Sequence, residues 1–246
     1  MGKPDLNELI VFFWYMSCWK TEFCYYMARE NVQIGNKVWF ISIELDEYNL
    51  KLRIARKRAC IDKNMFQNQT YTDTQRILMK DEFEKIDKMK DIFIVNPIND
   101  TSHIIDEIRR LYDQWCRLFV IDNLDKISGV ENDNTRYQYI TSSLQNLKNE
   151  LPICIILIHH AKKPLNKIQS YSPAGMSWLR GSQKIMDNAT QVIEIWRDLD
   201  PDIIQEEKDK VVLYQYKDTF EWWNGKVTIY FSKWDYYGER QNELPF

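Results

Sequence analysis

Residues 9–21 read LIVFFWYMSCWKT, a stretch that carries the strongest local signal for the fold. Its first five residues, Leu9–Phe13, are all apolar, and a short apolar run that includes β-branched residues is typical of a buried strand. Its last two residues are a Lys-Thr pair, and the residues that follow, Glu22–Glu30, have a helical pattern. The stretch therefore predicts a strand, a tight connection and a helix, in that order.

The tight connection has the spacing of a phosphate-binding loop. Residues 14–21 match the pattern G-x-x-x-x-G-K-[ST] at Lys20 and Thr21, with Trp14 and Trp19 in place of the two glycines. In such a loop, backbone N–H groups at a helix N-terminus hold the phosphates of a nucleotide. An indole at either glycine position is expected to obstruct that approach. The residues predicted to line the nucleotide are Trp14, Ser17, Cys18, Trp19, Lys20 and Thr21.

Further apolar strands recur along the chain, separated by amphipathic segments. The spacing of Ile140, Leu144 and Leu147 predicts one such intervening helix, with a single buried face. Strands that alternate with helices are typical of a mostly parallel sheet covered by helices. The other strands predicted in this part of the chain are Val38–Ile43, Ile92–Val95, Leu118–Ile121 and Ile153–Ile158.

The pattern changes after Gln191. Three strand-like runs, joined by polar loops with little room for helices, predict antiparallel additions to the edge of the sheet. These runs are Val192–Trp196, Val211–Tyr216 and Val227–Phe231. The predicted fold class is α/β, with a mostly parallel central sheet flanked by helices and antiparallel strands at its C-terminal edge. We expect a single domain over residues 1–246, with a core at 8–197 and the β additions at 198–246.

The composition narrows the class of protein. A chain of 246 residues with 44% hydrophobic and 28% charged residues is ordinary for a globular protein, which excludes collagen-like, fully disordered and membrane-spanning classes. The net charge of −3 argues against a protein that coats nucleic acid through its overall charge, but it leaves room for a local basic loop. The five cysteines include no CxxC pair, so they indicate neither a disulfide framework nor a zinc site, and they favour a cytoplasmic location.

Chemically useful residues stand at the ends of the predicted strands. Glu44 follows the second strand, Asp122 ends the strand LFVID, and His159 and His160 end the fifth strand. Because the carboxyl ends of parallel strands meet at one edge, where α/β proteins bind ligands, we expect these side chains to converge. An aspartate after an apolar strand is the form of a Walker B element, whose carboxylate holds Mg²⁺. Two adjacent histidines on a strand are poorly placed to bind the same metal ion, so a phosphate sensor is favoured over a zinc site.

Taken in order, these motifs resemble the RecA-like ATPase domain of the DnaB-like replicative helicases, in superfamily 4. The resemblance covers nearly the whole chain and includes LRGSQKIMDNATQVIEIWRD at residues 179–198 and the closing strand GKVTIYF at 225–231. The segment HHAKK at 159–163 looks more like the RepA-type hexameric helicases, because DnaB-like proteins usually have Gln where His160 stands. Membership of the wider family is therefore better supported than membership of either subfamily.

The resemblance implies ATP as the substrate and Mg²⁺ as the cofactor, and it implies a role for each residue. Lys20 would neutralise the β- and γ-phosphates, and Thr21 and Asp122 would position Mg²⁺. Glu44 would orient or deprotonate the attacking water, and His160 would sense the γ-phosphate. These roles depend on one another.

The resemblance also implies that the protein acts on single-stranded DNA as a homo-oligomer, a ring of six subunits. The segment Ala161–Gly175 contains Lys162, Lys163 and Lys167 and lies where the family carries a loop that faces the DNA channel, so these lysines are expected to bind DNA. Arg180 would either brace this loop or contact a neighbouring subunit. The family further implies a primase or a loader as a partner, and no membrane.

One departure from the family pattern falls at the expected subunit interface. The family usually has a Lys-x-Arg pair near the penultimate strand, which is donated to the γ-phosphate bound by the neighbouring subunit. Here the sequence reads Lys217-Asp218-Thr219. Lys217 is therefore retained as an interface residue, and the arginine finger is absent from its usual position.

Glycine is scarce, with 7 residues against 9 tryptophans, and several tryptophans stand where this fold favours glycine. Reading Trp14 and Trp19 as glycine turns residues 14–21 into GYMSCGKT, a complete phosphate-binding loop. Trp115 also stands where a turn suits glycine, and the same holds in the C-terminal hairpin for Trp222, Trp223 and Trp234. One hypothesis is that the source reads UGA codons as glycine, whereas the sequence as written translates them as tryptophan. UGG codons at positions 14 and 19 would refute it.

Three functions are compatible with these observations. The first is an ATP-dependent helicase or translocase that acts on single-stranded DNA in replication. The second is a RecA-like recombination or loading ATPase that hydrolyses ATP without unwinding DNA. The third is an inactive RecA-like scaffold, which applies if Trp14 and Trp19 are real.

Overall fold

A computed structural model of the chain describes residues 7–14, 20–89, 92–95, 99–128, 133–162, 172–179, 181–198, 200, 202–203, 210–219, 225–232 and 235–238. Its strands are β1 (Glu8–Trp14), β2 (Val38–Ser42), β3 (Ile92–Val95), β4 (Leu118–Asp122), β5 (Cys154–His160), β6 (Gln191–Trp196), β7 (Lys210–Asp218), β8 (Lys226–Ser232) and β9 (Asp235–Gly238). Its α-helices are α1 (Lys20–Gln33), α2 (Glu47–Arg58), α3 (Lys63–Asn68), α4 (Asp73–Asp87), α5 (Thr101–Tyr112), α6 (Asp133–Glu150) and α7 (Ser182–Asn188). Two 3₁₀ turns are η1 (Leu124–Lys126) and η3 (Met176–Trp178).

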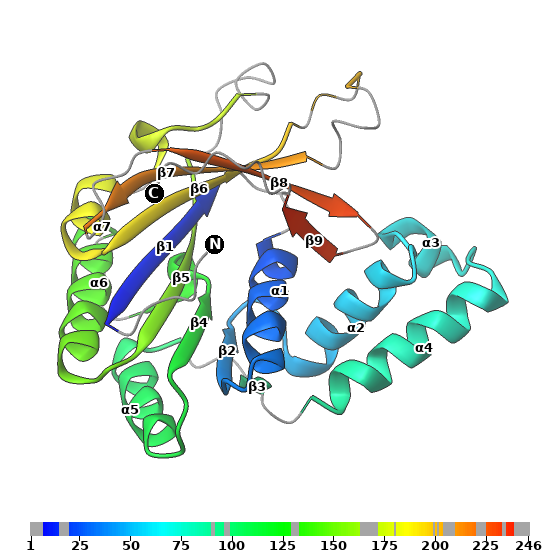
Figure 1. The fold of residues 1–246 in the computed structure, drawn as a ribbon, viewed down its shortest axis with the longest axis horizontal. Helices are drawn as coiled ribbons and strands as arrows, with labels where there is room; N and C mark the ends of the chain where they lie inside the picture. The colour runs from blue at the N-terminus through cyan, green and yellow to red at the C-terminus, as the bar shows by residue number, and fades with distance from the viewer. Residues whose placement is uncertain are drawn as a thin grey trace.

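A single sheet of nine strands runs through the described part of the molecule, in the order β3-β2-β4-β5-β1-β6-β7-β8-β9 (Figure 1). The strands from β3 to β6 are mutually parallel, and β7, β8 and β9 are each antiparallel to the strand before them. Parallel neighbours need crossover connections, and helices supply them, because a helix can return the chain to the same end of the sheet. The predicted fold class is therefore confirmed.

The predicted strands are all present, with bounds that differ by no more than two residues at either end. For the central parallel strands the prediction succeeds because they are buried on both faces, so their sequences read as continuous apolar runs. All residues of β1, β2 and β4 are buried. The sequence pattern did not predict β9, which extends the antiparallel edge by one strand.

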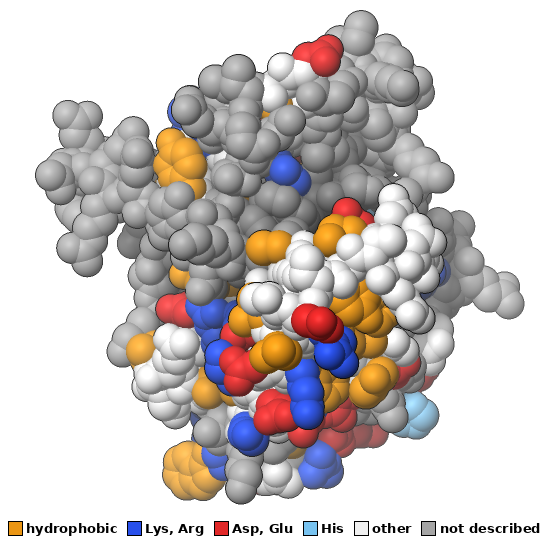
Figure 2. Space-filling view, turned by 90° about the vertical axis from the view of Figure 1, so that its right-hand side faces the viewer, with side chains coloured by type: hydrophobic (Ala, Val, Ile, Leu, Met, Phe, Trp, Pro, Cys, Tyr) orange, Lys and Arg blue, Asp and Glu red, His pale blue; other side chains and the backbone are white. Residues whose placement is uncertain are grey.

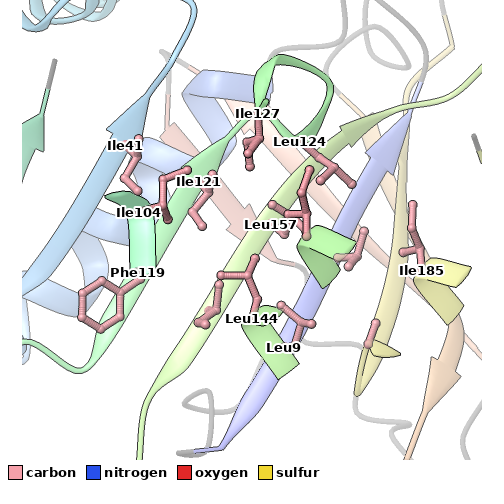
Figure 3. Packing of buried hydrophobic residues seen from close by; sticks show 14 of the residues in the cluster. Leu9, Ile41, Ile104, Phe119, Ile121, Leu124, Ile127, Leu144, Leu157 and Ile185 are labelled. Carbon is pink, nitrogen blue, oxygen red and sulfur yellow. The ribbon is translucent and has the colours of Figure 1, made fainter. Parts of the chain in front are cut away.

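Helices cover both faces of the sheet, and β1 shows how a strand serves both. Leu9 and Val11 belong to a hydrophobic cluster with α5, α6 and α7, whereas Ile10 and Phe12 belong to a second cluster with α1 and α2 (Figure 1). Successive side chains of a strand point to opposite faces, so one apolar strand contributes to both layers. Figure 3 shows the first cluster, in which the residues from the helices include Ile104, Leu144 and Ile185.

The helices α2, α3 and α4 form an arm beside the sheet, which the sequence pattern did not resolve into three helices (Figure 1). Helix α2 packs against α4, and the ion pair between Arg58 and Glu82 at 3.0 Å lies between them. Figure 2 faces this arm, where basic and acidic side chains intermingle. In the described part of the chain, no helix has both the length and the apolar character needed to cross a membrane.

The C-terminal ends of helices α1 and α5 show whether a tryptophan stands in a backbone position that favours glycine. After α1, the N–H of Gly35 donates to the carbonyl of Val32 and the N–H of Asn36 to that of Asn31, which is a Schellman motif with Gly35 in the left-handed region at φ +90°. After α5, Trp115 occupies the equivalent place at φ +68°. Its side chain is 77% exposed. The sequence prediction of a glycine-type turn at Trp115 therefore holds for its backbone. The ends of α2 and α3 show that other residues also take this place, since Cys60 and Gln69 do so.

Candidate active site

The carboxyl edge of the parallel sheet brings the ends of β2, β4 and β5 together. Ser42, the last residue of β2, pairs in register with Asp122, the last residue of β4. The N–H of Ile43 then donates to the carbonyl of Asp122 at 2.7 Å, which carries the pairing one residue further and delivers Glu44 to the edge. His160 ends β5 and pairs in register with the last residue of β1. Three candidate residues from separate parts of the chain thus share one edge, as parallel topology predicts.

Glu44 and His160 meet at this edge through a third residue, Asn123. The Nδ2 atom of Asn123 lies 2.7 Å from Oε1 of Glu44 and 3.0 Å from Nε2 of His160. Nε2 of His160 is 3.8 Å from the same Oε1 of Glu44. Sequence reasoning missed Asn123, although it directly follows Asp122 and so also stands at a strand end. Glu44, Asn123 and His160 are called the edge cluster below.

Asp122 is a buried carboxylate that suits a magnesium ion. Its side chain is 2% exposed, and the peptide bond that links it to Asn123 is cis. Ser42 pairs with Asp122 in register, and the buried hydroxyl of Ser42 makes no hydrogen bond to any described residue. Hard oxygen ligands are what Mg²⁺ prefers, and Mg²⁺ usually keeps several waters, which can hydrogen-bond to such a hydroxyl. The residues at this place therefore fit a hydrated Mg²⁺.

The phosphate-binding loop is described only at its two ends. Trp14 is the last residue of β1, its side chain is 1% exposed, and its carbonyl accepts the N–H of Ala161 at 2.7 Å. Its side chain belongs to the hydrophobic cluster on the α1 face. Lys20 and Thr21 open α1, so the positive end of that helix follows the loop directly, but their side chains are not described. The predicted residues Ser17, Cys18 and Trp19 lie outside the described residues.

His159 and His160 are adjacent in sequence but lie in different surroundings. His159 is fully buried, its ring centroid lies 5.0 Å from that of Tyr137, and its Nδ1 is 3.5 Å from a carboxylate oxygen of Asp125. The hydroxyl of Tyr137 donates to Asp125 at 2.7 Å. Burial, together with the hydrogen bond and the negative charge of Asp125, raises the pKa of Tyr137 to about 12. His159, Asp125 and Tyr137 are called the buried cluster below.

The predicted DNA-binding segment is described at its two stems. The N–H of Lys162 donates to the carbonyl of Trp178 at 2.7 Å, and its ammonium donates to the carbonyl of Ser177 at 3.2 Å. Ala161 and Leu179 form an antiparallel bridge beside them. These contacts close the base of the segment. The other predicted DNA-binding residues, Lys163, Lys167 and Arg180, lie outside the described residues.

A buried glutamate holds the returning stem of the same segment. Glu194 of β6 is 1% exposed, and its carboxylate accepts the N–H of Ala174, the N–H of Gly175 at 3.0 Å and the hydroxyl of Tyr216 at 2.8 Å. Burial raises the pKa of Glu194, and the three hydrogen bonds oppose that rise. Sequence reasoning did not find Glu194. The one feature of the sequence that singles out Glu194 is its position as a charged residue inside an apolar strand.

Lys217 lies away from the edge cluster of its own chain. It pairs with Val192 near the start of β6, toward the amino ends of the parallel strands. Its side chain is half-buried, and its ammonium donates to the carbonyl of Met186 in α7 at 2.5 Å. Burial lowers the pKa of Lys217. A residue at this end of the sheet does not reach the edge cluster of the same chain.

Comparison with known proteins identifies the fold and the family. The family model described as the DnaB-like helicase C-terminal domain matches residues 6–227. Among solved structures, one that is described as an ATPase domain has a TM-score of 0.78 and 16% identity, over 96% of this chain and 86% of that one. A DnaB-like replicative helicase, described with its interactions with primase, also has a TM-score of 0.78 and 16% identity.

The second of these likenesses covers 94% of this chain but 57% of the helicase, so this chain spans a little over half of that protein. No curated protein matches the sequence. Structural likeness at 16% identity shows the fold, and the family model, which spans most of the sequence, shows the relationship. The chain belongs to the family of DnaB-like helicase C-terminal domains, and its fold is the RecA-like ATPase fold of that family.

Proposed function

We propose that the protein hydrolyses ATP with Mg²⁺ at the carboxyl edge of the sheet and uses that reaction to move along single-stranded DNA, as a replicative helicase. The observation that carries the proposal is the edge cluster, in which Glu44 and His160 come within 3.8 Å of each other. A carboxylate and an imidazole at the same edge as a buried Asp122 form a set of groups suited to phosphoryl transfer.

The proposed roles follow from the chemistry of each group. Asp122 and Thr21 hold Mg²⁺, which neutralises charge on the phosphates when it is bound, and Lys20 contacts the β- and γ-phosphates. Glu44 is partly exposed, so water reaches its carboxylate. That carboxylate accepts a proton from the attacking water while the water oxygen bonds to the γ-phosphorus, and the bond from phosphorus to the β,γ-bridging oxygen breaks, leaving ADP and phosphate. His160 donates to the γ-phosphate.

Proposed binding of DNA rests on the predicted DNA-binding segment Ala161–Gly175, which is called the basic segment from here on. Lys162, Lys163 and Lys167 contribute positive charge, and Arg180 follows the segment. One stem is held by the bond from the Lys162 N–H to the carbonyl of Trp178, and the other by the bond from the Gly175 N–H to the carboxylate of Glu194. Three lysines neutralise few phosphates in one subunit, so we propose a hexameric ring that multiplies them. Lys217 then faces the neighbouring subunit. We also propose a primase or a loader as partner, and a cytoplasmic location.

A second candidate is the inactive scaffold, and one observation favours it. Trp14 is buried in the hydrophobic cluster on the α1 face, as expected of a tryptophan that serves the core. If the protein contains tryptophan at position 14, the backbone there does not have the conformational freedom of glycine, and nucleotide binding is weak or absent. The recombination or loading ATPase stays the second enzyme candidate, because it uses the same edge cluster.

Titration of a fluorescent ATP analogue separates these functions. The protein is made as written, with Trp14→Gly and Trp19→Gly together, and with Lys20→Ala added as the control that removes phosphate contact. Binding by the glycine protein that Lys20→Ala abolishes supports an enzyme, whereas no binding by the glycine protein contradicts both enzyme candidates. Binding followed by ATP hydrolysis that single-stranded DNA stimulates, without strand separation on a forked duplex, favours the recombination or loading ATPase over the helicase.

A further inference from the structure

We propose that Asn123 is a positioning residue, which orients the carboxylate of Glu44 and selects the tautomer of His160 for ATP hydrolysis. The inference rests on the proposed function, because it assigns Glu44 and His160 their roles in that reaction. It goes beyond that function because no motif in the sequence assigned Asn123 a role. The juxtaposition that carries it is the single amide nitrogen shared by two candidate catalytic side chains.

The proton positions follow from counting donors. An ionised carboxylate only accepts hydrogen bonds, so the Asn123 atom at 2.7 Å from Glu44 is the amide nitrogen and not the oxygen. The same nitrogen lies 3.0 Å from Nε2 of His160 and has only hydrogens to offer. Nε2 must therefore be the acceptor, and the hydrogen of the neutral imidazole lies on Nδ1. Asn123 uses both hydrogens of its amide in these two bonds.

The backbone holds this amide in place. Asn123 is fully buried and directly follows β4, the strand that carries Asp122. Its carbonyl accepts the N–H of Lys126 at 3.2 Å, which fastens it to the turn η1. The side-chain oxygen of Asn123 is also buried, and the described residues offer it no hydrogen bond. A buried oxygen left without a donor is uncommon, and sites where it occurs are often functional. Packing alone does not explain an asparagine at this place.

Two consequences for hydrolysis follow. Glu44 is held through Oε1, so its carboxylate keeps one orientation toward the attacking water, as a catalytic base does when a third group orients it. His160 has its hydrogen on Nδ1, so that atom is the donor it offers to a phosphate oxygen. Loss of the Asn123 amide removes both restraints while leaving Lys20, Thr21 and Asp122 unchanged. The binding of ATP and its hydrolysis are therefore separable at this residue.

The kinetic test introduces Asn123→Ala and Asn123→Asp separately into the form of the protein that hydrolyses ATP, either as written or with Trp14→Gly and Trp19→Gly. Both variants lack a donor to Glu44, and the aspartate variant keeps nearly the same shape. We expect kcat to fall by about 10- to 100-fold, the usual effect of losing a group that orients a catalytic side chain, with little change of KM. Asn188→Ala is the matched control, because the amide of Asn188 also donates to a side chain, Thr141 at 2.8 Å, outside the edge cluster. The control is expected to keep kcat.

A second readout needs no ATP. In the ligand-free protein, ¹⁵N NMR of histidine is expected to show that Nε2 of His160 carries no hydrogen, and Asn123→Ala is expected to shift the ring toward the other tautomer. A hydrogen on Nε2 in the parent protein overturns the inference, and so does an unchanged kcat in both Asn123 variants. If neither the protein as written nor its form with Trp14→Gly and Trp19→Gly hydrolyses ATP, the proposed function fails, while the tautomer measurement still tests the role of Asn123.

Discussion

The neighbouring residues His159 and His160 lie in two regions with different surroundings. His160 is part of the edge cluster, where its ring shares the amide of Asn123 with Glu44. His159 is part of the buried cluster, where it lies against Tyr137 and Asp125 with no exposed surface. One step along β5 thus separates an imidazole at the carboxyl edge of the sheet from an imidazole in the core.

In this fold, the position of a histidine along the strand decides its surroundings, and its residue type does not. Alternation along β5 sends successive side chains to opposite faces, so adjacent histidines cannot both reach the site. It also means that they do not share a metal ion. Substitutions at the edge cluster should therefore change activity, whereas substitutions at the buried cluster should change stability.

The largest effect is expected at the edge cluster. Replacing His160→Ala should lower kcat for ATP by about 10²- to 10³-fold, the usual cost of removing one donor to a developing negative charge. The free energy of unfolding should change little, because the ring is partly exposed at the edge of the sheet. Steady-state ATPase assays and urea denaturation measure the two quantities. A stable variant with full activity would remove His160 from the proposed mechanism.

The buried cluster should respond in the opposite way. His159→Ala leaves a cavity between β5 and α6, and we expect it to lower the free energy of unfolding by about 2–5 kcal/mol, as for other large buried side chains. ATP affinity of the folded fraction should stay close to that of the parent. Urea denaturation gives the first value and an ATP-analogue titration the second. A variant that loses affinity without losing stability would contradict the separation of the two clusters.

Gly181 tests how far the buried cluster extends toward the basic segment. A Cβ added there would lie 2.6 Å from Cδ2 of Tyr137, and the residue has φ +64°. Gly181→Ala is therefore expected to cost about 1–3 kcal/mol in stability, from the left-handed backbone and the displaced ring. Gly35→Ala is the matched control, because Gly35 is also left-handed but has open space around its Cβ position. Equal losses in both variants would show that contact with Tyr137 adds nothing.

The smallest effect is expected from the hydroxyl of Tyr137. Tyr137→Phe removes its hydrogen bond to Asp125 and should cost about 1 kcal/mol at neutral pH. The pKa of Tyr137 is raised to about 12 in the folded protein, against about 10 when unfolded. Between these values the folded state keeps a proton that the unfolded state releases, so stability falls as the pH rises. The variant should lose less stability than the parent between pH 10 and 12, as measured by urea denaturation. Parallel curves would contradict this assignment.

Much of the fold was predictable because its strands are apolar on both faces and so carry a strong local signal. The positions of Asp122 and His160 at one edge were predictable as well, since both directly end apolar strands of a parallel sheet. The arm of α2–α4 was not resolved, because its hydrophobic positions are few and its helices are held by ion pairs and mutual packing. Asn123 and Glu194 were missed because their importance lies in contacts with distant residues.

Local sequence patterns were enough to predict the strands β1 to β8 in chain order, the α/β class, the loop spacing at residues 14–21 and the family. Each of these depends on local periodicity or on short motifs, which a linear reading retains. The contacts of Asn123 with Glu44 and His160, and the burial of His159 in the core, become visible only in the folded chain. Such contacts join residues that are far apart in the chain, and they depend on register and on side-chain direction. The folded sheet sets both at once.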